Sequence, residues 1–350
     1  MSRQADPLKI SSGAIASWIK IALEKVGVPS HNAIVVVDAL IQTSLWGIDS
    51  HGIARLPHYL TRLEMGSITT TPNITFTCTG VATGNVDGDN GLGIVVSRYA
   101  MDRAIDLALE SGAGVVGVSA SSHCGAIGLY TRQATRKGCL GIAFTHSDSF
   151  VVPFGGDKAF FGTNPISIAL PSQDSDRPLC VDMATSVVPW NRIMNARRDG
   201  TKVPDCWGVD ALGNKTSQPE DVTAVNPMAE HKGYALAFLI DMLCGPLNGM
   251  PFGPHITPMY ESLEKHRNLG SLMIAVDLAR FPGGAMLPSV IGAAINEVKG
   301  SNEKIYYPGE PEYLAQETRS QDGIPVEWTL IEQFDYWSLK LGIPPIRRTI

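Results

Sequence analysis

The chain has 350 residues, of which 44% are hydrophobic, and 28 basic against 34 acidic side chains give it a net charge of −6. This length and hydrophobic content are enough for a large core, in one big domain or in two to three intertwined ones. No run of lysine and arginine exceeds two residues, which argues against nucleic acid or an anionic membrane as a partner.

The composition also bears on assembly and location. Charged residues make up only 18% of the chain, below the roughly 25% of soluble domains, so we expect a subunit interface to cover part of the surface. The six cysteines have no C-x-x-C spacing, so neither a disulfide framework nor a cysteine zinc site is expected. The opening MSRQADPLKISS lacks the apolar core of a signal peptide, and the apolar stretch 234–247 is too short to span a bilayer. These features predict a reduced, soluble, cytoplasmic protein.

The predicted elements begin with helices at 11–27 and 31–46, where apolar residues recur with helical periodicity. A third helix is expected from the N-caps Asp49 and Ser50 to about residue 64, with a kink or a break into two turns at Pro57. The elements expected after it are strands at 74–78, 82–87, 115–119, 140–145, 166–170, 179–182 and 271–276 and helices at 93–110, 125–137, 232–246, 286–298, 310–319 and 326–341.

His123 lies in the loop between the predicted strand 115–119 and the predicted helix 125–137. Residues of such loops commonly point into a ligand crevice, and histidine can take or give a proton near neutral pH. The residues alone leave two alternatives open, a catalytic acid or base and an ordinary loop histidine.

A second group of candidate residues lies on the predicted third helix. His51, Arg55 and Tyr59 recur at every fourth position, so they would share one face, with apolar residues such as Leu56 and Leu60 opposite them. Arginine binds carboxylates through two parallel hydrogen bonds. The pattern is also compatible with an ordinary solvated helix face.

Three further patterns bear on cofactors and metals. The chain has no G-x-G-x-x-G fingerprint, and the loop "HCGAIG" could hold a phosphate or nicotinamide or could be a plain tight turn. No H-E-x-x-H or similar cluster is present, so no metal is expected. Lys232 begins an apolar helix, where a lysine is disfavoured by the helix dipole, so it either meets a polar or anionic ligand or is simply exposed.

Six stretches occur in an order typical of the malate/L-lactate dehydrogenase type 2 family, whose members are NAD(P)-dependent oxidoreductases with a non-Rossmann fold. They are "SHGIARLPHY", "SHCGAIG", "FGTNPISIALP", "DMATS", "HKGYALA" and "YYPGE". The resemblance extends from about Ile15 to Tyr336. Two stretches depart from the family pattern: "AEHKGYAL" lacks the glycines that precede the lysine in many relatives, and Asn191-Arg192 replaces a frequent Gly-Lys.

The resemblance implies roles for individual residues. His123 would accept the proton in oxidation. The substrate-binding residues that it implies are Ser50, His51, Arg55, Tyr59 and Asp148. The cofactor-binding residues that it implies are Gly125, Ile127, Ser147, Val181, Asp182, Met183, Lys232, Gly309, Glu310 and Pro311.

The resemblance also implies an α+β fold, with a non-Rossmann cofactor domain around a mixed, largely antiparallel sheet and helical segments from both chain ends packed beside it. Residues 1–72 together with about 284–350 would form a helical substrate and dimerisation domain. Residues 73–225 would form the cofactor domain, and 226–283 would complete the cleft. A homodimer or a dimer-based oligomer is expected.

Within the family, stretches such as "HSDSFVVPFGG" and "IYYPGEPE" resemble most the members that oxidise (S)-ureidoglycolate to oxalurate in purine and allantoin degradation. Asp148 agrees with this substrate, because a carboxylate accepts hydrogen bonds from a ureido group and repels the second carboxylate of malate. Glu310 could accept from a ribose hydroxyl and repel a 2′-phosphate, which favours NAD without excluding NADP.

Other functions stay open at this stage. The chain could oxidise another 2-hydroxy acid, such as malate, lactate or sulfolactate, or reduce a cyclic imino acid as some relatives do. A non-catalytic binding protein is a further alternative, against which the presence of both His123 and Arg55 argues.

Overall fold

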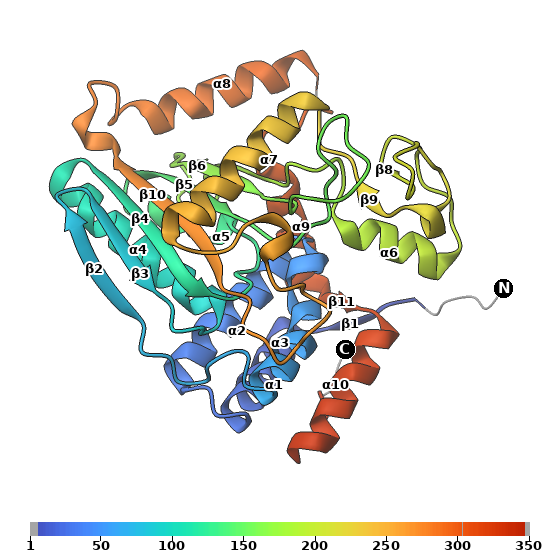
Figure 1. Ribbon diagram of the computed structural model, residues 1–350. Helices are drawn as coiled ribbons and strands as arrows, with labels where there is room; N and C mark the ends of the chain where they lie inside the picture. The colour runs from blue at the N-terminus through green and yellow to red at the C-terminus, as the bar shows by residue number, and fades with distance from the viewer. Residues whose placement is uncertain (1–5, 303, 347–350) are drawn as a thin grey trace.

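A mixed sheet forms the centre of the computed structural model, which describes residues 6–302 and 304–346 (Figure 1). Within those residues the sheet has seven strands in the order β2-β3-β4-β10-β5-β6-β7. The strands are β2 (Thr75–Gly80), β3 (Thr83–Asp87), β4 (Ala113–Ser121), β10 (Leu269–Asp277), β5 (Cys139–Thr145), β6 (Ile166–Leu170) and β7 (Leu179–Met183). All seven were expected from the sequence, and the α+β class is confirmed.

The pairing of β10 decides where the loops of the sheet emerge. β3 and β4 pair in parallel, and the other neighbours pair antiparallel. β10 lies between β4 and β5, so these two strands run in the same direction. Leu269 is opposite Ser121, and Ser271 is opposite Thr145. The loops that follow β4 and β5 therefore leave the sheet at the same edge.

One face of the sheet is covered by α4 (Gly93–Ser111), with α5 (Gly128–Thr135) beside it. Val96, Ala100 and Ala104 follow one another at four-residue intervals on α4 and are completely buried. They pack in one apolar cluster with Val116 and other strand residues. α5 begins three residues later than predicted, so the loop that carries His123 is longer than the sequence pattern indicates.

Helices from both ends of the chain pack together beside the sheet, as expected. They are α1 (Ser12–Lys25), α2 (Ser30–Leu45), α3 (Leu56–Glu64) and α10 (Trp328–Leu341). Two short strands that the sequence did not reveal, β1 (Leu8–Ile10) and β11 (Ile324–Val326), pair antiparallel and join the ends. The Trp18 indole also donates to Ser338 Oγ at 2.9 Å.

The predicted third helix is broken, which corrects the argument that His51, Arg55 and Tyr59 share a helix face. Two 3₁₀ turns, η1 (Asp49–His51) and η2 (Ile53–Arg55), precede α3. The break falls at Gly52, where a Cβ atom would lie 2.1 Å from Ser44 Oγ, so only glycine fits against α2. The buried positions expected for Leu56 and Leu60 are confirmed.

The remaining elements surround this framework. They are α6 (Trp190–Asp199), β8 (Gly208–Val209), η3 (Pro219–Asp221), β9 (Ala224–Val225), α7 (His231–Cys244), η4 (Pro246–Asn248), η5 (Gly253–His255), η6 (Leu278–Arg280), α8 (Leu287–Ser301) and α9 (Glu310–Asp322). The sequence pattern did not reveal α6, β8 or β9. α8 lies at the top of Figure 1, away from α1 and α10, and the predicted domain boundaries stay a prediction. None of the described helices is both long and apolar enough to cross a membrane.

Candidate active site

His123 lies in the loop after β4, where residues from three segments surround it. Its Nδ1 is 2.7 Å from Tyr59 Oη and 3.3 Å from the amide nitrogen of Gly125. The His51 ring stacks on the His123 ring, with 5.5 Å between the ring centroids. His123 Nε2 has no hydrogen-bond partner among the described residues, so this nitrogen is available to a ligand.

The surroundings of His123 hold it neutral. Burial lowers the pKa of His123 well below its ordinary value of 6.5, and the neighbouring His51 and Arg55 lower it further. Burial also raises the pKa of Tyr59, so its phenol stays protonated. The Gly125 amide points its N–H at Nδ1, which accepts it only when Nδ1 carries no hydrogen. For Nε2 to accept a proton, Nδ1 must instead carry the ring hydrogen and donate it to Tyr59 Oη, because the two ring nitrogens have opposite roles in neutral imidazole.

The two 3₁₀ turns position Ser50, His51 and Arg55. Ser50 Oγ lies 2.8 Å from His51 Nδ1, and the backbone carbonyl of Ser50 accepts from Arg55 Nε. Burial lowers the pKa of His51 to about 3, with Arg55 contributing. Arg55 Nη1 donates to Tyr260 Oη at 2.9 Å, and Arg55 forms no ion pair with a described carboxylate. His51, Arg55 and Tyr59 therefore meet at His123, although no regular helix carries all three.

A cavity of about 70 Å³ lies against these residues. Its walls include His51, Arg55 and His123 on one side. Those on the other side are Ser147, Asp148, Phe150, Thr163, Pro189, Trp190, Asn191, Met259 and Tyr260. Since the loops after β4 and β5 leave the same edge of the sheet, His123 and Ser147 reach one space from positions that are distant in sequence.

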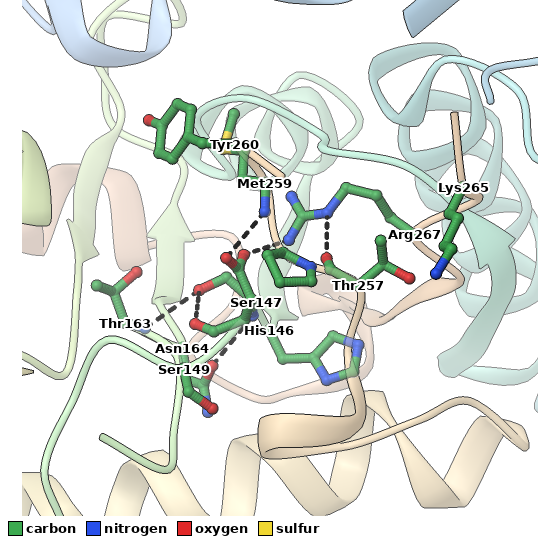
Figure 2. Close-up of polar contacts among 12 residues, drawn as sticks. His146, Ser147, Ser149, Thr163, Asn164, Thr257, Met259, Tyr260, Lys265 and Arg267 are labelled. Carbon is green, nitrogen blue, oxygen red and sulfur yellow. Dashed lines mark hydrogen bonds and ion pairs between the residues drawn. The ribbon is translucent and has the colours of Figure 1, made fainter. Parts of the chain in front are cut away.

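Asp148 does not present a free carboxylate to this cavity, which corrects the charge argument made from the sequence. Asp148 Oδ1 forms a buried ion pair with Arg267, and Oδ2 accepts from the Met259 amide at 2.9 Å. Figure 2 shows Arg267 between the Thr257 carbonyl, to which it donates at 3.1 Å, and the loop that follows β5. The charge of Asp148 is compensated, so repulsion of a second substrate carboxylate no longer follows.

Ser147 is fixed on the cavity side of the same loop. Its amide donates to Asn164 Oδ1 at 3.2 Å, and its hydroxyl accepts from the Thr163 amide at 3.3 Å (Figure 2). These contacts leave Ser147 in the wall that faces His123, which is where a contact to a nicotinamide ring would be useful.

Three of the segments proposed for the cofactor gather on the other side of the His123 loop. The Gly128 amide donates to Asp182 Oδ2 at 2.8 Å, and the Cys180 amide donates to the Pro308 carbonyl at 3.2 Å. These bonds bring the loop 125–127, strand residues 181–183 and the turn 309–311 together. Burial raises the pKa of Asp182 to about 6, against the effects of the Gly128 hydrogen bond and of Arg132.

Two observations describe the surroundings of these segments. A Cβ atom at Gly128 would lie 2.8 Å from both Arg132 Nη1 and Asp182 Oδ2, so glycine is required for these two side chains to approach the start of α5. Arg132 Nη1 is buried without a hydrogen-bond partner, which leaves one cationic donor unused. An unused cationic donor beside the predicted cofactor segments matches a phosphate-bearing ligand.

Two other predicted cofactor residues have different surroundings. Glu310 forms an ion pair with Lys299, and its Oε2 accepts from the Tyr307 amide at 3.1 Å, so its carboxylate is already engaged. Lys232 is exposed in the first turn of α7 and has no contact with the 125–128 loop or with Asp182. Ala229 and Glu230, which precede Lys232, both have positive φ angles, of 47° and 55°.

Sequence reasoning missed several residues of the site. Tyr260 accepts from Arg55 and donates to Asn191 Oδ1 at 3.3 Å, and it closes one side of the cavity. Arg267 was not singled out, although an arginine directly before an apolar strand is a signal that a buried charge needs a partner. Arg132 lies on a predicted helix with nothing in the sequence to set it apart. No group of three or more histidine, cysteine or acidic side chains in the described residues could hold a metal ion.

Comparison of the chain, with its mixed sheet and its cavity at His123, with known proteins gives a class of dehydrogenase. The sequence profile of the malate/L-lactate dehydrogenase family matches residues 10–335. The chain belongs to this family.

Individual relatives agree over almost the whole chain. The ureidoglycolate dehydrogenase (NAD(+)) of Escherichia coli K12 is 35% identical over 325 residues, which are 91% of this chain and 93% of that protein. The (2R)-3-sulfolactate dehydrogenase (NADP(+)) of Chromohalobacter salexigens is 34% identical over 75% of this chain and 79% of its own. The structure of malate dehydrogenase from Pyrococcus horikoshii superposes with a TM-score of 0.88, at 31% identity and 97% coverage of both chains.

Proposed function

We propose that the protein oxidises a 2-hydroxy acid, with hydride transfer to a nicotinamide dinucleotide and proton transfer to His123. The observation that carries the proposal is the pair formed by His123 and Tyr59 at 2.7 Å, in a cavity that Arg55 also lines. This arrangement provides a neutral base for the hydroxyl and a cation for the carboxylate of one small substrate.

The residues of the chain have separate tasks in this proposal. Arg55 binds the substrate carboxylate, because its guanidinium lies at the cavity without a carboxylate partner of its own. His123 Nε2 takes the hydroxyl proton while the hydride leaves the same carbon. Tyr59 accepts from His123 Nδ1 and so keeps the ring in the tautomer and orientation that this transfer requires.

NAD, or NADP in its place, supplies the hydride acceptor when it is bound. The residues proposed to hold it are Gly125, Ile127, Ser147, Val181, Asp182, Met183, Gly309, Glu310 and Pro311, with Lys232 from α7. Relatives named for NAD(+) and for NADP(+) have almost the same identity to this chain, which supports either dinucleotide. Glu310 is paired with Lys299, so it gives no reason to prefer NAD.

For the substrate we propose (S)-ureidoglycolate first, which would place the protein in allantoin degradation. The support is the similarity to the Escherichia coli enzyme. Asp148 adds no support, because its carboxylate is paired with Arg267. Malate is the second candidate, because compensation of the Asp148 charge removes the electrostatic objection to a second carboxylate.

The experiment that tests the function is a rate measurement on the purified protein with NAD or NADP and a panel of 2-hydroxy acids. We expect formation of reduced nicotinamide, with a higher kcat/KM for (S)-ureidoglycolate than for malate. Arg55→Lys should raise KM several-fold, because it keeps the charge but loses the paired geometry. A preference for malate would overturn the substrate, and absence of activity with every acid would overturn the function.

We further propose a homodimer located in the cytoplasm. α7 and α8 expose several large apolar side chains, which a single chain leaves in contact with water. They are Leu236, Phe238 and Leu239 on α7, and Val290 and Val298 on α8. Light scattering on the purified protein tests the dimer, and a monomer at micromolar concentration would contradict it.

A further inference from the structure

Arg132 carries a buried positive charge that no carboxylate in the described chain pairs with directly. The residue is 5% exposed, and its Nη1 has no hydrogen-bond partner. Its Nε donates to Tyr313 Oη at 3.4 Å, and its guanidinium carbon lies 4.1 Å from the centroid of the Trp46 ring and 5.5 Å from that of Tyr313. Aromatic rings stabilise a cation but do not satisfy its N–H groups, so an unused donor remains in a poorly solvated place.

The unused donor lies where the proposed cofactor segments converge. A Cβ atom added at Gly128 would lie 2.8 Å from Arg132 Nη1 and 2.8 Å from Asp182 Oδ2. Tyr313, which Arg132 contacts, donates to the Pro178 carbonyl at 2.5 Å. Its hydroxyl would also lie 3.2 Å from a Cβ atom added at Gly309. The guanidinium is thus bordered by the His123 loop, by β7 and by the turn before α9.

The surrounding structure fixes the guanidinium in place. Stacking on Trp46 sets the plane of the group, and the Trp46 indole is itself held by Gln316 Oε1 at 3.0 Å. Two more arginines, Arg98 and Arg136, line a cavity of about 210 Å³ together with Arg132 and form no ion pair among the described residues. Asp38, which lines the same cavity, and Asp182, which lies near Arg132 at Gly128, oppose an anion, but the three arginines outnumber them.

We propose that Arg132 binds a phosphate group of the dinucleotide. The proposal rests on the proposed function, since it requires a dinucleotide at these segments. A guanidinium held by stacking loses little freedom when it binds, and its N–H edge matches phosphate oxygens. Two phosphates have the required chemistry, the pyrophosphate that NAD and NADP share and the ribose 2′-phosphate that only NADP carries.

The test is calorimetric titration of the full-length protein and of Arg132→Met with NADH, NADPH and adenosine. Loss of a charged hydrogen bond should raise the dissociation constant on the order of tenfold or more. A rise for both dinucleotides identifies the pyrophosphate, and a rise for NADPH alone identifies the 2′-phosphate. Adenosine, which has no phosphate, should bind to the variant as it binds to the unchanged protein.

Two further variants separate phosphate binding from a structural role. Arg198→Met removes an exposed arginine on α6 that does not line this cavity, and it should change each dissociation constant less than twofold. Arg132→Lys keeps the cation and should recover part of the affinity, which also covers the case in which Arg132→Met does not fold. Unchanged dissociation constants in both Arg132 variants, or equal weakening of adenosine, overturn the inference. If the unchanged protein binds neither dinucleotide, the proposed function itself fails.

Discussion

His123 and His146 differ in how many of their ring nitrogens the protein itself uses. His146 is buried, its Nδ1 lies 3.0 Å from Asp241 Oδ1, and its Nε2 accepts from the Gly270 amide at 3.0 Å. Both nitrogens of His146 are therefore used within the protein. His123 uses only Nδ1 and leaves Nε2 to the cavity, which is the geometry that a base requires.

Replacement of His123 by alanine should lower kcat about 10²–10⁴-fold, the contribution that a positioned base makes. The dissociation constant for NADH should change little, because His123 itself is not among the residues proposed to hold the dinucleotide. Steady-state rates and calorimetric titration of His123→Ala measure the two effects. His31→Ala, at an exposed histidine, is the control. A variant of His123 that retains near-normal turnover would remove this residue from the mechanism.

The pH dependence of oxidation should reflect the low pKa of His123. Burial and the neighbouring His51 and Arg55 keep this pKa well below 6.5, so the neutral ring that accepts a proton predominates at pH 6.5 and above. As pH falls, the ring is protonated only in a more acidic range, and the rate decreases there. We expect kcat/KM to stay level from about pH 8 down to pH 6.5, and a titration with a midpoint near or above 6.5 would contradict the assignment.

At the scale of elements, the start of α7 combines two residues in backbone conformations that glycine prefers. Ala229 has a φ of 47°, and Glu230 has a φ of 55° and a ψ of −120°. Residues with side chains adopt such conformations at a cost of about 1–3 kcal/mol each. The start of α7 is thus a place of local backbone strain, in the segment that positions Lys232.

Glu230→Gly should relieve part of this strain and raise the free energy of unfolding by ~1 kcal/mol, because glycine adopts the conformation readily. Chemical denaturation of the two proteins measures the change. Glu220→Gly is a matched control at an exposed glutamate with an ordinary φ angle, and it should not stabilise the protein. If both glycine variants destabilise equally, the start of α7 is not strained.

At the scale of the whole molecule, the two ends of the chain form one apolar cluster. The rings of Trp18 and Phe334 lie 5.0 Å apart, and both are almost fully buried. Phe334 is 1% exposed, while Tyr336 on the same helix is 58% exposed. Contacts between residues more than 300 positions apart therefore hold α1 and α10 together in this cluster.

Phe334→Ala should lower the free energy of unfolding by ~3–5 kcal/mol, as deletion of a buried aromatic side chain usually does. Tyr336→Ala should change it by less than ~1 kcal/mol, since its ring is mostly in water. Thermal and denaturant unfolding of both variants provide the comparison. Equal effects of the two substitutions would show that the cluster does not determine stability.

The parts of the molecule that the sequence predicted are those with local signals. Apolar periodicity located the strands of the central sheet and most helices, and short motifs located His123 and Arg55. The partner of Asp148 lies 119 positions away, and the tertiary contact with Arg267 has no periodic signature. The break at Gly52 depends on the approach of Ser44 from α2, which is likewise a property of packing. Arg132 was missed for the same reason, because its aromatic neighbours come from distant helices.

The position of β10 has a consequence for how the protein is made. This central strand, Leu269–Asp277, is translated more than 120 residues after β5, yet it separates β4 from β5 in the finished sheet. Until it arrives, β4 and β5 have no common neighbour, and their edges are open to wrong partners. A nascent chain that ends before β10 therefore has no assembled catalytic centre, and activity begins only when this late segment closes the gap between two early ones.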